Sequence, residues 1–169
     1  MPRQERERRY IAEYLKEQYP KGNWQLNVEL GRIPSEYVQR YGMTKAAALF
    51  RPTRPRVDAV IWEPGAYTLV EAKLRDIKAG IGDLLYYKAV LPETPDLPYY
   101  EGQPYRLRLV VPWMIEWIKQ VSDAAGVEVV VYWQEWIADY VRERLDYFTA
   151  DWRAKRAEVM KMREILGVE

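Results

Sequence analysis

The chain has 169 residues, of which 49% are apolar and 14% aromatic, so it can bury the core of one domain and does not have the composition of a disordered chain. It contains no cysteine and no histidine, which excludes disulfides, thiolate and imidazole metal sites, and catalysis by a Ser-His-Asp triad. A metal ion would have to be held by oxygen atoms, which favours a hard ion such as Mg²⁺ or Mn²⁺.

The net charge of +1 hides an uneven distribution. Residues 1–56 hold 12 Lys and Arg against 6 Asp and Glu, whereas residues 57–169 hold 14 against 19. The basic half can attract a polyanion, although a solvated, charged helix accounts for part of the excess equally well. No apolar run approaches the ~20 residues that span a bilayer, and the charged N-terminus lacks the apolar core of a signal peptide. We therefore expect a cytoplasmic protein without membrane contacts.

Hydrophobic periodicity predicts the helices and strands of an α/β protein. We expect Ser35 and Thr44 to cap two short helices, and the proline-rich stretches 51–56 and 92–104 to form loops. The expected helices are 3–19, 35–41, 45–50, 79–91, 113–124 and 134–166, and the expected strands are 24–30, 57–62, 67–73, 105–111 and 127–132.

Two of the predicted strands form a hairpin around the turn 63–66, and its register brings two acidic residues together. Pairing across the turn places Trp62 opposite Tyr67, and therefore Asp58 opposite Glu71. Directly opposed residues of antiparallel strands have Cβ atoms roughly 4.5–5.5 Å apart. The two carboxylates are thus expected side by side on one face of the sheet.

Both strands are apolar on both faces, so this carboxylate pair is expected to be buried. Two buried carboxylates repel each other unless a divalent cation bridges them or one of them is protonated. Lys73 lies two residues beyond Glu71 on the same face and offsets part of the charge. The alternative is that Asp58, Glu71 and Lys73 lie at strand ends and are simply solvated.

An acid on one strand and Glu-x-Lys on the next resemble the motif of the PD-(D/E)XK nuclease superfamily. Here the motif reads as Asp58, then Glu71-Ala72-Lys73, without the proline of the name. The predicted order of elements over residues 3–132 also resembles that superfamily, apart from the short helices at 35–50.

The resemblance implies a restriction-endonuclease-like αβββαβ core with a mixed central sheet in residues 1–133. It also implies a metal-dependent deoxyribonuclease that hydrolyses phosphodiester bonds, with an endonuclease favoured over an exonuclease. Residues 134–169 lie outside the resemblance.

The site that the resemblance implies holds one or two Mg²⁺ or Mn²⁺ ions. Asp58, Glu71 and the backbone carbonyl of Ala72 would bind the metal, and Lys73 would orient a water molecule or neutralise charge. Many members carry a further glutamate on the first helix, and Glu7 points toward the apolar stripe of the expected helix. The alternative for Glu7 is a solvated first turn.

Asp83 and Tyr87 are expected to support the site. They have the spacing of the Gln-x-x-x-Tyr motif of recombination-type exonucleases, with Asp in place of Gln, and share one helix face. Archaeal-type Holliday-junction resolvases offer a comparable resemblance, so both subgroups remain open, as do recombination, repair and phage DNA processing as contexts.

Basic residues flank both motif strands and are candidate contacts to DNA phosphates, although ordinary solubilising charge is the alternative for each. They are Arg51, Arg54, Arg56, Arg75, Lys78 and Lys88.

The expected helix 134–166 carries apolar residues at spacings of four and three, with Lys155 interrupting the pattern. They are Val141, Leu145, Phe148, Trp152, Val159, Met162 and Leu166. This pattern predicts a helix pair between two copies, and so a homodimer; a kinked helix that packs on its own domain is the alternative.

Two alternatives to a nuclease remain open. One is a catalytically silent nuclease-like protein that binds DNA or serves in assembly, and the other is a plain α/β interaction module.

Overall fold

The structure is a computed structural model and describes residues 3–94, 97 and 104–166. The chain divides into two compact units, Met1–Tyr132 and Trp133–Glu169. Its described part is an α/β protein with one five-stranded sheet, which confirms the predicted class. The helices are α1 (Arg3–Gln18), α2 (Ser35–Tyr41), α3 (Met43–Phe50), α4 (Ile77–Val90), the 3₁₀ helix η1 (Leu91–Glu93), α5 (Glu116–Ala125) and α6 (Glu135–Leu166). The strands are β1 (Trp24–Glu29), β2 (Arg56–Glu63), β3 (Ala66–Ala72), β4 (Tyr105–Val111) and β5 (Val127–Val131).

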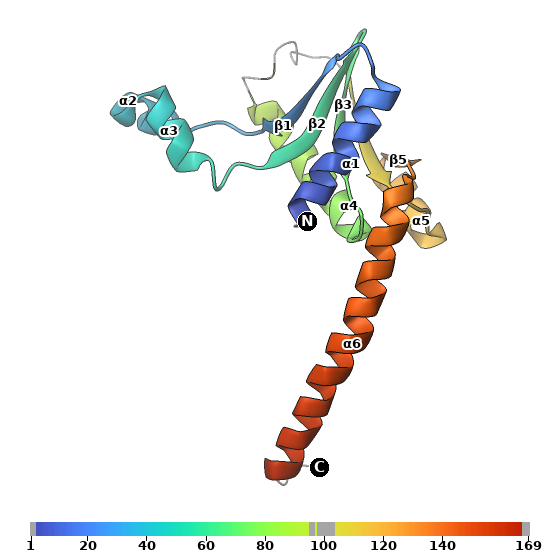
Figure 1. The fold of residues 1–169 in the computed structure, drawn as a ribbon. Helices are drawn as coiled ribbons and strands as arrows, with labels where there is room; N and C mark the ends of the chain where they lie inside the picture. The colour runs from blue at the N-terminus through green and yellow to red at the C-terminus, as the bar shows by residue number, and fades with distance from the viewer. Residues whose placement is uncertain (1–2, 95–96, 98–103, 167–169) are drawn as a thin grey trace. The chain divides into compact units, whose positions relative to one another are not determined.

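The sheet is mixed, and its strands follow the order β1-β2-β3-β4-β5 (Figure 1). β1, β2 and β3 are antiparallel to one another, whereas β3, β4 and β5 are parallel. The β3–β4 connection contains α4 and the β4–β5 connection contains α5, as parallel neighbours require.

The predicted register of the β2–β3 hairpin is confirmed. Trp62 pairs with Tyr67, and Glu63 pairs with Ala66 across a turn that contains Gly65. Gly65 has a φ of 77°, a left-handed conformation that glycine adopts without strain. The regular pairs continue in the same register as far as Ala59 with Val70.

Alternation along the strands gives the two faces of the sheet different partners. Val60, Leu69 and Leu109 belong to the apolar core that α4 and α5 cover. The preceding residue of β4, Arg108, lies on the other face, where it reaches Tyr14 of α1. Because Glu71 alternates in step with Leu69 along β3, it belongs to the face covered by α4, and Asp58 lies near it where the regular β2–β3 pairs end.

Some element ends differ from the sequence prediction. Ser35 is the first residue of α2 and makes no capping hydrogen bond; Pro34 precedes it. α3 begins at Met43, directly after Gly42, so Thr44 lies inside the helix and is not its cap. Gly42 has a φ of 77°, which ends α2 and lets α3 start at the next residue.

The predicted loop 92–104 begins as a 3₁₀ turn, and α5 starts at Glu116, three residues later than expected at Trp113. The rest of that loop falls largely on residues outside the described ranges.

The second unit contains α6, in which Val159, Met160 and Met162 are exposed. Several apolar positions of the predicted repeat, such as Leu145 and Trp152, lie outside the described side chains. Homodimerisation through this helix therefore stays a prediction. None of the described helices is both long and apolar enough to cross a membrane.

Candidate functional site

Asp58 interrupts the otherwise regular pairing of β2. Its counterpart in the register with β1, Asn27, has a left-handed φ of 53°, and neither ladder makes a regular pair at Asp58. On the β3 side, the backbone N–H of Ala72 donates a hydrogen bond of 2.9 Å to Asp58 Oδ2. The carboxylate thus takes the place of a backbone acceptor, and the hydrogen bond fixes its orientation between the two strands.

Glu71 lies on the neighbouring strand β3 and is only 4% exposed. Its Oε1 is 2.8 Å from Lys73 Nζ. Its Oε2 is buried and has no hydrogen-bond partner among the described residues. The hydroxyl of Tyr87 lies within hydrogen-bonding reach of this carboxylate, which contributes to the raised pKa of Tyr87, but its proton is donated to the carbonyl oxygen of Arg56 at 3.0 Å. Glu71 therefore keeps one buried oxygen free to accept a cation or a proton.

Burial and mutual repulsion make it difficult to ionise both carboxylates. Burial, and then the charge of Asp58, raise the pKa of Glu71 to about 8 despite the nearby Lys73. Burial also raises the pKa of Asp58, although the Ala72 N–H and Lys73 oppose this shift. A carboxylate pair with raised pKa values is stabilised in its charged form when a cation binds between its oxygens.

Lys73 links the carboxylate pair to α4. Its Nζ lies 2.8 Å from Glu71 Oε1 and 2.8 Å from Asp83 Oδ2. Burial lowers the pKa of Lys73, but the charges and hydrogen bonds of Glu71 and Asp83 outweigh burial and raise the pKa above its usual value. The lysine is therefore an ammonium ion held between two acids.

Gly80 on α4 makes room for the side chain of Lys73, a role that the sequence did not reveal. A Cβ atom at this position would lie 2.9 Å from Lys73 Cγ and 2.5 Å from Leu109 Cδ1. Both distances are shorter than real carbon contacts, so any larger residue would displace the lysine stem or the leucine. The helix thus approaches the sheet closely where it braces the lysine.

Glu7 lies near the pair without completing a metal cage. It is half-buried on α1, and its charge contributes to the raised pKa of Asp58. Within the described residues, no three acidic side chains converge as a metal-binding group. The donor set is therefore Asp58 and Glu71, and a hard ion would complete its shell with water, backbone or substrate oxygens. The free Oε2 of Glu71 fits such an ion.

The arginines that precede β2 converge on one internal partner, Glu29. Arg51, Arg54 and Arg56 approach its carboxylate to 3.6, 3.0 and 2.9 Å. Arg54 also donates to the carbonyl of Leu30 at 3.2 Å, and its side chain is 9% exposed. These residues brace the ends of β1 and β2, and their contact with phosphates stays a prediction, with Arg54 the least accessible of the three.

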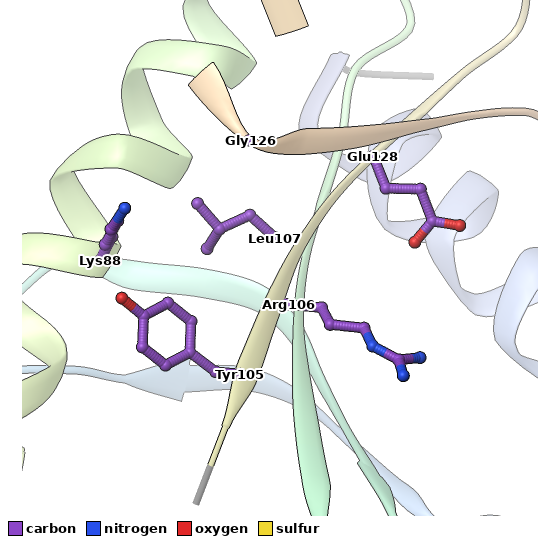
Figure 2. Close-up of a pocket in the computed structure, with 6 residues that line it drawn as sticks. All are labelled: Lys88, Tyr105, Arg106, Leu107, Gly126 and Glu128. Atoms are coloured by element: carbon purple, nitrogen blue, oxygen red, sulfur yellow. The ribbon is translucent and has the colours of Figure 1, made fainter. Parts of the chain in front are cut away.

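The basic residues after β3 occupy different places. Arg75 and Lys78 are exposed close to the start of α4, near Lys73 in sequence. Lys88 instead lines a hollow of about 320 Å³ with Tyr105, Arg106, Leu107, Gly126 and Glu128. Figure 2 shows Lys88, Tyr105 and Leu107 on one side of β4, and Arg106 and Glu128 on the other. Because Tyr105 pairs with Tyr67, Lys88 lies toward the hairpin turn and away from Glu71.

Comparisons with known proteins do not assign the chain to a family. It matches no protein-family model and no curated protein. Among solved structures, a protein of unknown function, AF1548, is similar at a TM-score of 0.40 and 14% identity, over 71% of this chain. The match spans 54% of that protein's length. A similarity at this level carries no argument about function, which therefore depends on the geometry of the site.

Proposed function

We propose that the chain is a metal-dependent DNA nuclease of the PD-(D/E)XK class that hydrolyses phosphodiester bonds, acting as an endonuclease. The observation that carries this proposal is the buried Glu71 carboxylate with one free oxygen, placed beside Asp58 and Lys73. A solvated group at a strand end would not be 4% exposed, and most buried polar side-chain atoms of folded proteins have a hydrogen-bond partner.

Asp58 and Glu71 would hold Mg²⁺ or Mn²⁺, with the backbone carbonyl of Ala72 as a further oxygen and Glu7 beyond them. The bound ion supplies Lewis-acid activation of water and of the scissile phosphate. The Ala72 N–H orients Asp58. Lys73 holds one oxygen of Glu71 and keeps its proton, so it offers positive charge where negative charge develops on the phosphate. Asp83 positions that ammonium group.

Cleavage of supercoiled and linear DNA in Mg²⁺, Mn²⁺ or EDTA tests the proposal. We expect nicking of the closed circle in either metal and none in EDTA. Glu71→Gln and Lys73→Met should abolish it. Glu63→Gln is the matched control, because it also removes a carboxylate. Glu63 lies at the other end of β2, about 16 Å from Asp58 along the strand. Metal-independent cleavage, or equal cleavage by Glu71→Gln and the wild type, contradicts the proposal.

A catalytically silent DNA-binding or assembly protein is the second candidate. The observation that favours it is the position of Lys73 Nζ, 2.8 Å from both Glu71 and Asp83, where it supplies an internal cation. Such a protein would bind DNA without cleaving it in either metal. It would also keep its DNA affinity in Glu71→Gln.

DNA as the substrate and a homodimer through α6 are parts of the same proposal. The exposed Val159 and Met162 belong to the predicted repeat of α6. Paired copies would suit cuts on two strands. Sedimentation of the full chain and of Val159→Glu/Met162→Glu tests the dimer: the wild type should sediment as a dimer and the variant as a monomer.

A further inference from the structure

The segment between β1 and β2 contains an arm, residues 32–50, that consists of α2 and α3. Figure 1 shows the two helices beyond the ends of β1 and β2. α2 buries no residue, and α3 buries only Ala46 among its residues. The helices pack on each other through Tyr37 and Phe50, whose rings meet edge to face with centroids 4.8 Å apart. An arm that adds so little to the core of the domain needs another explanation.

The arm carries more cations than acids. Arg32, Arg40 and Lys45 are exposed, and none of them forms an ion pair with a described residue. Glu36 is the only acid among residues 32–50 of the sequence. Glu36 lies four residues before Arg40 on α2, but no ion pair joins them among the described residues, in contrast to Arg9–Glu13, Lys119–Asp123 and Arg142–Asp139 on other helices.

Two of these cations, Arg40 and Lys45, make cation–π contacts with the ring of Tyr41. Arg40 Cζ lies 5.3 Å from the centroid of the Tyr41 ring, and Lys45 Nζ lies 5.6 Å from it. Contacts of this kind are weakly attractive, about 0.5–1 kcal/mol at exposed sites. They hold two like charges at one place, although the charges repel each other. Such an arrangement gains energy when a polyanion approaches.

The base of the arm is fixed at the same end of the sheet as the carboxylate pair. Glu29 pairs with Arg54 and Arg56, and the N–H of Leu30 donates to the carbonyl of Pro55 at 2.9 Å. Arg56 is two residues from Asp58 on β2. The base of the arm therefore lies at the Asp58 end of β2 and not at the hairpin turn.

From this placement and charge, we infer that the arm of residues 32–50 binds the phosphate backbone of duplex DNA outside the cleavage site, with Arg32, Arg40 and Lys45 as its contacts. The choice of DNA as the polyanion rests on the proposed nuclease function. The arm contributes affinity and leaves the chemical step to Asp58, Glu71 and Lys73.

The experiment measures binding and cleavage separately. Fluorescence anisotropy of a labelled duplex in EDTA gives the Kd over a series of salt concentrations. Arg40→Ala/Lys45→Ala removes two charges of the arm. Lys16→Ala/Lys21→Ala removes two exposed charges near the hairpin end of the sheet and serves as the matched control. Arg40→Lys/Lys45→Arg keeps the charges, because a phosphate contact needs a cation and not one particular side chain.

We expect the arm variant to raise the Kd about tenfold or more and to reduce the slope of log K against log salt by about 2, since each lost phosphate contact removes about 0.9. The control and the exchanged variant should bind like the wild type. At saturating DNA, the arm variant should cleave at the wild-type rate.

Each outcome separates the two proposals. Cleavage by the wild type together with an unchanged slope in the arm variant overturns the inference and leaves the nuclease standing. Binding that depends on the arm, without cleavage in any metal, supports the inference and overturns the nuclease. Absence of any DNA binding by the wild type overturns both. Circular dichroism of each variant shows whether it is folded.

Discussion

The sheet carries a charged cluster around a largely buried cation on each face, and the two clusters differ in the partners of that cation. On the α1 face, Arg108 is 7% exposed. Its Nε lies 2.9 Å from Glu128 Oε2, and its Nη1 donates to the hydroxyls of Tyr14, at 3.3 Å, and Tyr19. One cation thus meets one acid and two neutral phenols. On the α4 face, Lys73 is the single cation beside three acids.

The difference separates a structural network from a candidate active site. A buried charge that serves packing is stable only when its hydrogen bonds are complete, as they nearly are around Arg108. Around Glu71 they are incomplete, because Oε2 has no partner among the described residues and the neighbouring carboxylates repel it. A buried carboxylate oxygen without a hydrogen-bond partner is tolerable where a bound ligand supplies that partner during function.

Removing the charge of Asp58 should produce the largest effect. Asp58→Asn keeps an oxygen that can accept the Ala72 N–H, so we expect a folded protein whose cleavage rate falls by about 10³-fold or more. Plasmid nicking in Mg²⁺ measures the rate. Glu128→Gln, which removes the acid of the Arg108 cluster, is the control, and its cleavage rate should be close to that of the wild type. An equal loss of cleavage rate in Asp58→Asn and Glu128→Gln would contradict the conclusion that only the Glu71 cluster is catalytic.

Arg108→Met should lower stability rather than activity. The substitution leaves the phenols of Tyr14 and Tyr19 without their partner, so the free energy of unfolding should fall by about 1–3 kcal/mol. Urea denaturation measures it. Arg106→Met on the same strand, whose side chain is 62% exposed, should change stability by no more than about 0.5 kcal/mol. A stability of Arg108→Met as high as that of this control would show that the network is not structural.

The pH dependence of stability should distinguish Glu71 from an ordinary acid. Its pKa is raised from 4.5 to about 8 in the fold, so the folded state retains a proton that the unfolded chain releases between these values. The stabilising contribution is complete below pH 4.5 and is lost as the pH rises through 8. In EDTA, Glu71→Gln should lack this loss and be more stable than the wild type at pH 8.5, by up to about 4 kcal/mol at roughly 1.4 kcal/mol per pKa unit. Parallel pH profiles of the two proteins, from urea denaturation, would contradict the burial argument.

Two glycines of α4 offer the smallest and most local comparison. Gly80→Ala should displace the stem of Lys73, and because misplaced catalytic groups lose rate, we expect cleavage to fall about tenfold. Overpacking should also lower stability by about 1–3 kcal/mol. Gly82 has open space around its Cβ position, so Gly82→Ala should keep the wild-type rate and stabilise the protein by up to about 1 kcal/mol. Single-turnover cleavage and thermal unfolding measure both effects. Equal rates in the two variants would show that Gly80 does not position the lysine.

The order of elements and the hairpin register were predictable because they follow from local patterns. Apolar periodicity marks each helix and strand, and the turn at 63–66 fixes which residues oppose each other. In the structure Lys73 contacts both Glu71 and Asp83, and Asp58 lies on the neighbouring strand; that these residues form an active site stays a prediction. The restriction-endonuclease-like assignment of the core stays a prediction.

Contacts between distant segments were not predictable. Glu29 meets Arg54 and Arg56 only because β1 pairs with β2, and Gly80 meets Lys73 only because α4 packs on the sheet. The cap of α3 was mispredicted because the positive φ of Gly42 starts the helix before Thr44 can cap it. Each failure reflects geometry that a local pattern does not contain.

Calorimetric titration with Mn²⁺ tests most directly whether Asp58 and Glu71 form a cation site. The wild type and Glu63→Gln should both bind the ion, more tightly at pH 8.5 than at pH 6.5 because binding requires deprotonated carboxylates. Asp58→Asn and Glu71→Gln should show no saturable heat. Wild-type affinity in Glu71→Gln, or no binding by the wild type, would contradict the account.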